Sequence, residues 1–270
     1  MVLRLVGSEM CIRDRPLPVL VEALPEGGKG FDVFMAEDVM FCRHYQYHQQ
    51  KLVLMLAAMR HYADELRSAG FTVHYHQLDP ASVSFQDQLH SWLQRLAVTE
   101  LWHFEIETKP LQSRLRSLCA ALNVTRNEIP SPMFLCNRQE FESFVDDSKS
   151  LQMARFYKQQ RLKLDILLTP DCQPQGGQWS FDAENRKKLP KDVQPPALPQ
   201  AFENKHLAEV ISLVAEVFAD HPGQAKDFWW PTTRAGALAW LDDFLQQRLA
   251  QFGPFEDAIS PVSYTHLTLP

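Results

Sequence analysis

A basic segment followed by a loop with glycines and a tryptophan is the part of this chain best suited to contact a polyanion. The residues from Lys149 to Leu164 include five Lys or Arg and no Asp or Glu, although the net charge of the whole chain is -6. Such a local concentration of positive charge is typical of a phosphate-binding surface. We predict a helix here that binds nucleic acid through Arg155, Lys158, Arg161 and Lys163. The alternative is a solvated surface helix.

The loop after this helix has residue types that suit the same contact. Gly176 and Gly177 permit close approach of the backbone, and Trp179 and Phe181 offer surfaces on which a base can stack. Further cations follow that can pair with phosphates; they are Arg186, Lys187, Lys188 and Lys191. We therefore extend the predicted DNA interface to Gly176, Gly177, Trp179, Arg186, Lys187 and Lys188.

Two carboxylates, Glu37 and Asp38, directly follow the apolar run that begins at Val33. Open α/β sheets bind ligands at the carboxyl ends of their strands, so these side chains are candidates for a binding pocket. For Glu37 the alternative is an ordinary strand-end carboxylate that faces solvent. The next segment, HYQYH, has two histidines four positions apart, His44 and His48. A metal site needs at least a third ligand, so we predict no metal and interpret the segment as an aromatic wall or as plain packing.

Strands and helices alternate through the first part of the chain, which favours an α/β fold whose parallel sheet has helices on both faces. Apolar runs predict strands, and apolar residues at helical spacing predict helices between them. The expected strands are 33–37, 72–78, 101–105 and 127–130, and the expected helices are 51–69, 85–96 and 111–122. Asn137 and Glu140 form a capping box that should open a short helix ending at Val145.

The composition changes after Leu168. Residues 169 to 200 include six prolines, which is too many for regular structure and indicates a linker. Two helical patterns follow, at 206–218 and 234–252. Thr233 is the expected N-cap of the second helix and Gly253 its end. We expect Leu238, Leu241, Leu245 and Leu249 to point inward. An α/β domain is thus followed by a linker and by the beginning of an all-α domain.

Several of these motifs together resemble the bacterial photolyase-related proteins, the cryptochrome and (6-4) photolyase branch that carries an iron-sulfur cluster. The motifs lie between residues 31 and 259 and read MAED, YHQQKL, AMRHYADELRSAGF, SLQMARFY, GGQWSFDAENR and FGPFEDAI. The resemblance implies an α/β antenna domain at 16–168, an interdomain loop at 169–204 and the start of a helical flavin domain at 205–261. It also implies that Glu37, Asp38 and His48 line an antenna pocket, which in this branch holds a ribityl lumazine.

The resemblance implies light-driven repair of damaged DNA. A reduced flavin donates an electron to a pyrimidine photoproduct that has been flipped out of the duplex, and the antenna passes excitation energy to the flavin. In the family, the FAD pocket and the iron-sulfur cysteines lie mostly in a C-terminal half that we expect to be missing here. The parent would be a DNA photolyase, and this part alone should be inactive. A cryptochrome-like photoreceptor without repair and a stand-alone α/β ligand-binding module are the alternatives.

The two ends of the chain look different from the rest. MVLRLVGSEMCIRDR at 1–15 and the residues 262–270, with SYTHLTLP, resemble translated sequencing-adapter sequence, so we expect both to lie outside the fold. The five cysteines are widely spaced and odd in number, which argues against a local metal site or a disulfide framework. No apolar stretch is long enough to span a membrane. We expect a cytoplasmic monomer.

Overall fold

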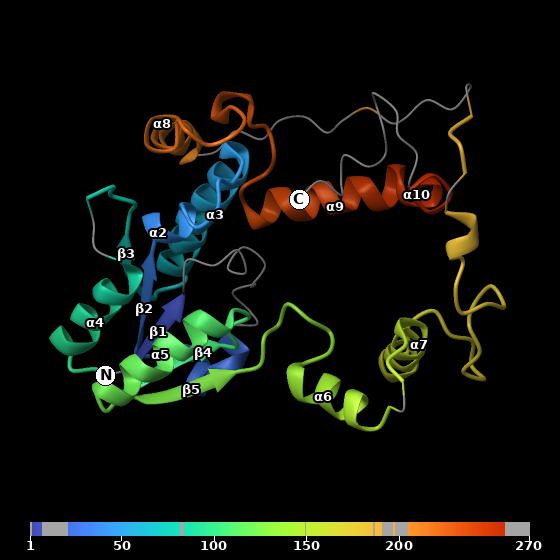
Figure 1. Cartoon of the computed structure of the whole chain (residues 1–270), viewed down its shortest axis with the longest axis horizontal. Helices are drawn as coiled ribbons and strands as arrows, with labels where there is room; N and C mark the ends of the chain where they lie inside the picture. Colours follow the sequence, from blue (N-terminus) through green and yellow to red (C-terminus); the bar gives the residue numbers. More distant parts are fainter. Residues whose placement is uncertain are drawn as a thin grey trace. The chain divides into compact units, whose positions relative to one another are not determined.

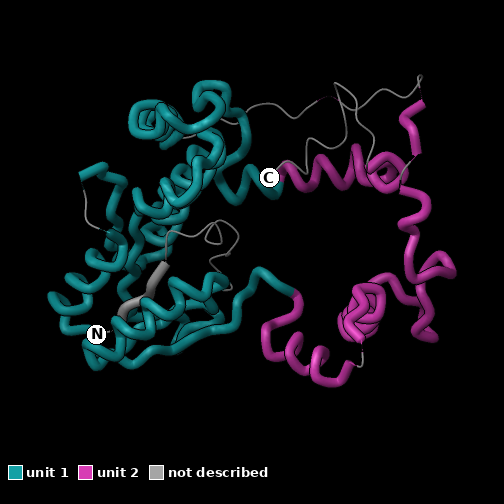
Figure 2. The backbone as a smooth tube through the Cα atoms, in the orientation of Figure 1, with its two compact units in different colours: residues 1–134, 200–238 teal, residues 135–199, 239–270 magenta. Residues whose placement is uncertain are grey.

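The computed structural model describes residues 21–81, 84–148, 150–185, 187–190, 197 and 205–256, and the backbone of residues 2–6. The chain divides into two compact units (Figure 2). Unit 1 comprises residues 1–134 and 200–238, and unit 2 comprises residues 135–199 and 239–270. Residues 200–238, which we expected to belong to the linker and the flavin domain, thus group with the α/β unit.

A parallel sheet of five strands forms the centre of unit 1 (Figure 1). The strand order is β3-β2-β1-β4-β5, and every pairing between these strands is parallel. The strands are β1 (Val2–Val6), β2 (Phe31–Ala36), β3 (Thr72–His76), β4 (Glu100–Phe104) and β5 (Thr125–Ile129). The predicted α/β fold with a parallel sheet is confirmed.

The central position of the sheet is taken by β1. Its backbone pairs with both β2 and β4, in a register that joins Val2 to Phe31 and to Glu100. This finding counts against our expectation that residues 1–15 lie outside the fold, as far as Val2–Val6 are concerned. The ladder is made by backbone groups, and a gap between two parallel strands can accept almost any extended segment. The foreign origin of these residues stays a prediction.

Helices cover both faces of the sheet because the side chains of β2 alternate between two cores. Val33 and Met35 pack with α3 (Gln49–Ser68), whereas Phe34 and Ala36 pack with α4 (Phe85–Arg95) and α5 (Lys109–Ala121). Each of these helices lies within a few residues of the range predicted from its apolar spacing. The longest, α3, ends two residues before Gly70, whose φ of +91° suits a glycine.

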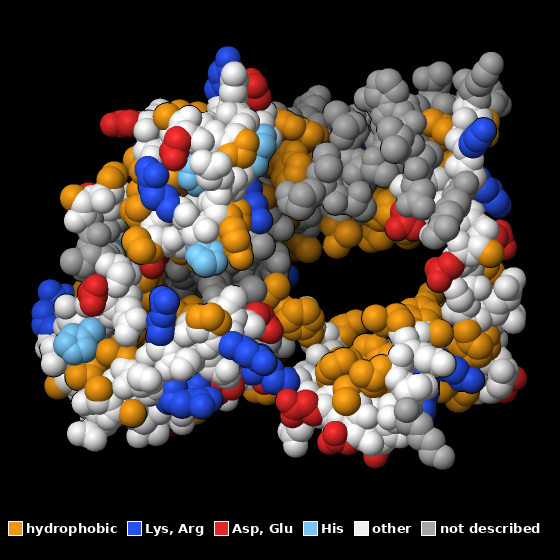
Figure 3. Space-filling model, in the orientation of Figure 1, with side chains coloured by type: hydrophobic (Ala, Val, Ile, Leu, Met, Phe, Trp, Pro, Cys, Tyr) orange, Lys and Arg blue, Asp and Glu red, His pale blue; other side chains and the backbone are white. Residues whose placement is uncertain are grey.

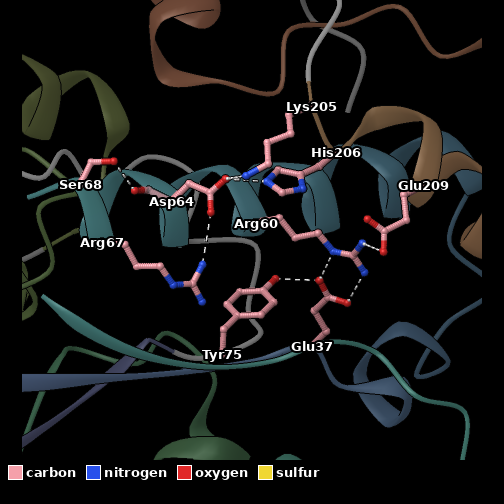
Figure 4. Close-up of polar contacts among 9 residues, drawn as sticks. All are labelled: Glu37, Arg60, Asp64, Arg67, Ser68, Tyr75, Lys205, His206 and Glu209. Atoms are coloured by element: carbon pink, nitrogen blue, oxygen red, sulfur yellow. Dashed lines mark hydrogen bonds and ion pairs between the residues drawn. The ribbon is translucent and has the colours of Figure 1, made fainter.

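A further helix, α8 (Leu207–Val217), packs against α3 within unit 1. Val210, Val214 and Phe218 are fully buried in the same core as the apolar face of α3. Polar contacts also join the two helices, because Asp64 of α3 lies 2.9 Å from Lys205 Nζ and 2.8 Å from His206 Nε2, in the two residues before α8 (Figure 4). Burial alone would raise the pKa of Asp64, but the hydrogen bonds from Lys205 and His206 and their charges lower it to about 2.

Unit 2 contains α6 (Arg138–Asp146), α7 (Met153–Leu164), α10 (Leu249–Phe255) and the part of α9 (Arg234–Gln247) beyond Leu238. The predicted capping box is confirmed, because Asn137 accepts from Glu140 N and Glu140 accepts from Asn137 N. Thr233 Oγ1 accepts from Gly236 N, as expected of an N-cap.

Two expectations for the last helices are wrong. The helical segment is divided at Arg248, and α10 continues through Gly253, so that glycine does not end it. The four leucines expected to point inward are each about half exposed: Leu238, Leu241, Leu245 and Leu249. In the part of the chain that the structure describes, no helix is long and apolar enough to cross a membrane.

The ion cluster at Asp64 predicts a specific loss of stability in acid. The pKa of Asp64 is lower in the folded protein than in the unfolded chain. The ionised carboxylate therefore adds to folding stability above about pH 4, and this stabilisation is lost as the pH falls toward about 2. We expect Asp64→Asn to flatten the fall in melting temperature across this range, as measured by circular dichroism.

Asp220→Asn is the matched control for this experiment, because the Asp220 carboxylate is 3.6 Å from Arg43 and more than half exposed. It should leave the acid profile close to that of the parent chain. Identical profiles for the parent and Asp64→Asn would contradict the interpretation.

Candidate functional site

The carboxylate of Glu37 is fully buried at the carboxyl end of β2 and accepts four hydrogen bonds. Arg60 donates through Nε at 2.7 Å and through Nη2 at 3.0 Å. The Tyr75 hydroxyl donates at 2.7 Å and the backbone N–H of Leu78 at 2.6 Å. A carboxylate has about four lone-pair positions, so these donors satisfy it completely. The alternative of a strand-end carboxylate in solvent is wrong for Glu37.

Arg60 connects Glu37 to the helical layer of unit 1. It extends from α3, and its third nitrogen, Nη1, lies 3.0 Å from Glu209 of α8 (Figure 4). Burial alone would lower the pKa of Arg60, but the hydrogen bond and the charge of Glu37 raise it above its ordinary value. The spacing of Glu37 and Arg60 in the sequence gives no sign of this pairing, so sequence reasoning missed Arg60.

The negative charge of Glu37 also affects its neighbours. Burial, followed by the charge of Glu37, raises the pKa of Tyr75 well above its usual range, so the hydroxyl stays protonated and can donate. Burial and the charges of Glu37 and Asp38 raise the pKa of Cys42 to about 12, so this thiol is not a nucleophile near neutral pH.

Asp38 joins β2 to two helices. Its Oδ1 accepts from Met40 N at 2.7 Å and caps the short helix α2 (Val39–Cys42). Its Oδ2 accepts at 3.2 Å from the backbone N–H of Phe85, the first residue of α4. Glu37 and Asp38 therefore use their oxygens to fix backbone at the carboxyl edge of the sheet.

His48 is the N-cap of α3. Its Nδ1 accepts from Gln50 N at 3.2 Å, which assigns the proton of the neutral ring to Nε2. The ring packs against Gly223, where φ is +79° and a Cβ atom would lie 1.9 Å from His48 Nε2. Glycine is therefore required at 223. Within the described residues, no three His, Cys, Asp or Glu side chains are placed to hold a metal ion.

Gln49, which follows His48, is a positioning residue that sequence reasoning missed. Its buried amide donates to Phe218 O and His221 O and accepts from Ala225 N at 2.9 Å. The segment after α8 is thereby held to the first turn of α3. The YHQQKL motif contains this glutamine, but nothing in its spacing shows that its partners lie about 170 residues away.

The predicted nucleic-acid helix is α7, and its cations differ in their surroundings. Arg155 and Lys158 are exposed. Lys163 lies 2.5 Å from Glu140 of α6. Arg161 is only 6% exposed, and it donates to Ile166 O at 3.2 Å and to Leu167 O. Arg161 therefore stabilises the turn after α7 and does not present its charge to solvent as a surface cation would.

Trp179 lies beside two of these cations. Lys158 Nζ is 4.7 Å and the Arg161 guanidinium carbon is 5.1 Å from the centroid of a Trp179 ring. The loop that brings Trp179 to this position turns at Gly176, where φ is +81° and a Cβ atom would lie 2.9 Å from the ring of Phe181. Gly177 also has a positive φ. These two glycines thus permit the turn of the chain.

The remaining predicted cations are less constrained. Lys187 and Lys188 are exposed, and Lys187 lies 3.5 Å from Glu184. Arg186 lies outside the described residues. In Figure 3, hydrophobic side chains gather on the visible surface over α6 and α7; the most exposed of this part include Phe141, Leu151, Met153, Tyr157 and Leu162. The exposed cations Arg155, Lys158, Lys187 and Lys188 are thus accompanied by apolar surface, a combination suited to a polyanion with aromatic bases.

Comparison with known proteins identifies relatives. Residues 21–230 match the family described as deoxyribodipyrimidine photo-lyase-related protein. The chain is 31% identical over 242 residues to the (6-4) photolyase of Agrobacterium fabrum strain C58. This alignment covers 88% of the chain and 48% of the relative, so the chain spans about half the length of that protein.

Of the two carboxylates that contact Arg60, the buried Glu37 should contribute much more to the free energy of unfolding than the exposed Glu209. Glu37→Gln should leave the Arg60 charge buried beside a neutral amide and lower the free energy of unfolding by about 3 kcal/mol. Glu209→Gln, which changes a carboxylate that is 59% exposed, should cost less than about 1 kcal/mol. Urea denaturation followed by circular dichroism measures both, and equal losses would show that the Glu37 pair is not special.

Proposed function

Because the chain belongs to the deoxyribodipyrimidine photo-lyase-related protein family, we propose that it is the DNA-binding N-terminal part of a light-dependent DNA-repair flavoprotein. In this proposal the chain supplies the α/β antenna domain, the interdomain segment and the first helices of the flavin domain. The reaction of the whole protein is reversal of a pyrimidine photoproduct in damaged DNA.

The observation that carries the proposal is the contact of Lys158 with Trp179 in unit 2. An exposed ammonium 4.7 Å from an indole ring places a phosphate-pairing charge next to a stacking surface. Nucleic-acid-binding proteins combine these two features, because the charge attracts the backbone and the ring receives an unpaired base. Arg155, Lys187 and Lys188 provide further exposed charge in the same unit.

The chain's own residues would act by binding and positioning. A bound reduced flavin would supply the electron for repair. We assign no described residue to the flavin or to an iron-sulfur cluster. Arg155 and Lys158 would pair with phosphates near the lesion. Arg161 would keep the turn after α7 in place and thereby hold Trp179 where a flipped base can reach it.

A ribityl lumazine antenna, if bound at the carboxyl edge of the sheet, would not be held by the oxygens of Glu37. The four lone-pair positions of Glu37 already accept from protein donors. Asp38 accepts from backbone N–H groups through both oxygens, with one donor at Oδ2. In our proposal these carboxylates act indirectly, because they fix Leu78 and Phe85 at the edge where α/β sheets bind ligands.

The proposal predicts that the salt dependence of DNA binding is set by the exposed cations of unit 2. Replacing Arg155, Lys158, Lys187 and Lys188 with alanine should weaken binding of duplex DNA. The slope of log affinity against log salt should fall by about 0.9 for each phosphate that the variant no longer neutralises. Fluorescence anisotropy over a salt series measures the slope.

The double variant Arg114→Ala with Arg116→Ala, compared with the double variant Arg155→Ala with Lys158→Ala, is the control with the same loss of charge, because both of its arginines are exposed on α5 in unit 1. It should retain the slope of the parent chain. An unchanged slope in the unit 2 variant, or an equal fall in the control, would refute the DNA interface.

Trp179→Ala should have a different effect from the variants that remove cations. Removal of a stacking surface releases few counterions, so the salt slope should stay near that of the parent. The preference for duplex containing a (6-4) photoproduct over undamaged duplex should fall by about fivefold to 150-fold, because stacking of one base on an aromatic ring contributes about 1–3 kcal/mol and about 1.4 kcal/mol corresponds to tenfold. Competition between the two duplexes at fixed salt measures this preference. A variant that keeps the full preference would show that Trp179 does not meet the lesion.

A further inference from the structure

A hollow of about 780 Å³ lies between the end of β3 and one side of α4, in unit 1. Tyr75, His76 and Asp79 line it from the strand and the turn that follows. Gln88, Trp92 and Arg95 line it from the helix. The hollow is therefore at the carboxyl end of a parallel strand, the position at which α/β sheets bind ligands.

The side of α4 that faces the hollow carries polar groups because of the helix period. Phe85, Leu89 and Leu93 occupy the opposite side and are buried in the core. Gln88, Trp92 and Arg95 recur at intervals of four and three, so they share one side of the helix. An ordinary solvated side would leave such residues extended in water. Here Gln88 is buried, and the other two are held by contacts.

Trp92 is fixed from two directions. Its Nε1–H donates to His76 Nε2, and its ring centroid lies 4.0 Å from that of His74, which is itself 2.8 Å from Asp32. Burial, followed by the charges of Arg95 and His74, lowers the pKa of His76, so this imidazole is neutral at pH 7. Because Nε2 accepts, the proton of His76 is on Nδ1.

Arg95 lies over the fixed indole, with its guanidinium carbon 4.0 Å from a Trp92 ring centroid. Stacking on an aromatic ring orders a guanidinium and leaves the N–H groups in its plane able to donate. Among the residues that the structure describes, no carboxylate or carbonyl accepts a hydrogen bond from Arg95. Within that part of the chain, the hollow thus contains a preorganised cation that is not paired with any carboxylate, Asp79 included.

We propose that this hollow binds a small molecule with one carboxylate or phosphate group and several hydroxyl groups. Arg95 binds the anionic group through paired N–H donors. Asp79, which already accepts from Ala81 N at 2.9 Å, disfavours a second negative charge and accepts from a hydroxyl. The amide of Gln88 adds a polar group to the wall. The proposed site is independent of DNA binding and of repair.

The test uses the indole N–H signal of Trp92 in a ¹H–¹⁵N spectrum of the full chain, assigned with Trp92→Phe. The probes are ribose 5-phosphate, gluconate, inorganic phosphate and ribose. Ribose 5-phosphate or gluconate should shift the Trp92 signal saturably with a Kd of about 1 mM or lower. Inorganic phosphate should bind more weakly than that probe, and ribose should leave the signal unchanged.

Arg95→Gln should weaken binding of the effective probe by about tenfold or more, because a charge-assisted pair of hydrogen bonds is removed. Arg116→Gln, on the exposed side of α5, is the control and should bind like the parent. The proposal is overturned if neither anionic probe gives a saturable shift up to about 10 mM, if ribose binds as tightly as ribose 5-phosphate, or if Arg95→Gln binds like the parent. The melting temperature of Arg95→Gln, compared with that of the parent, shows whether the variant still folds when its binding is weakened.

Discussion

The need to bury the charge of Glu37 organises unit 1. A carboxylate without contact to water is stable only if it is paired and fully hydrogen-bonded. The donors that achieve this come from three different elements: Arg60 from α3, Tyr75 from β3 and Leu78 from the turn after it. Glu209 then recruits α8 to the same arginine. The contacts of one buried carboxylate and its arginine therefore hold β2, β3, α3 and α8 in place relative to one another. The same contacts order the carboxyl end of β2, where an α/β sheet could bind a ligand.

The local pattern of the chain predicts its elements but not the partners of its polar groups. The α/β alternation, the range of α4 and the capping box at Asn137 follow from side-chain periods and from hydrogen bonds a few residues apart, so sequence alone shows them. The pairing of Glu37 with Arg60, and of Gln49 with the segment near His221, joins residues that are brought together only by the fold. The sequence shows that Glu37 and Asp38 end a strand, but it does not show which groups their oxygens contact.

The position of β1 in the sheet also could not be predicted from its local sequence. Residues 2–6 carry no signal that separates a sheet strand from any other short apolar run, and we expected them to lie outside the fold. Their backbone nevertheless completes the ladder between β2 and β4. Backbone N–H and C=O groups in the middle of a parallel sheet need partners whatever the sequence beside them. The need of β2 and β4 for backbone hydrogen-bond partners therefore determines the structure of residues 2–6 more than their own sequence does.

A count of charges in a sequence overestimates the charge that a surface presents. α7 looks uniformly basic in sequence, yet its cations have separate tasks: Lys163 pairs with Glu140, and Arg161 is buried against backbone carbonyls. Arg155 and Lys158 are exposed to solvent. The buried arginine still matters to the surface, because it orders the turn beside which Trp179 lies. The buried arginine of this segment shapes the loop, and only its exposed cations remain for the polyanion contact that we propose. Salt distinguishes the two roles, because it weakens an exposed phosphate contact more than a buried hydrogen bond.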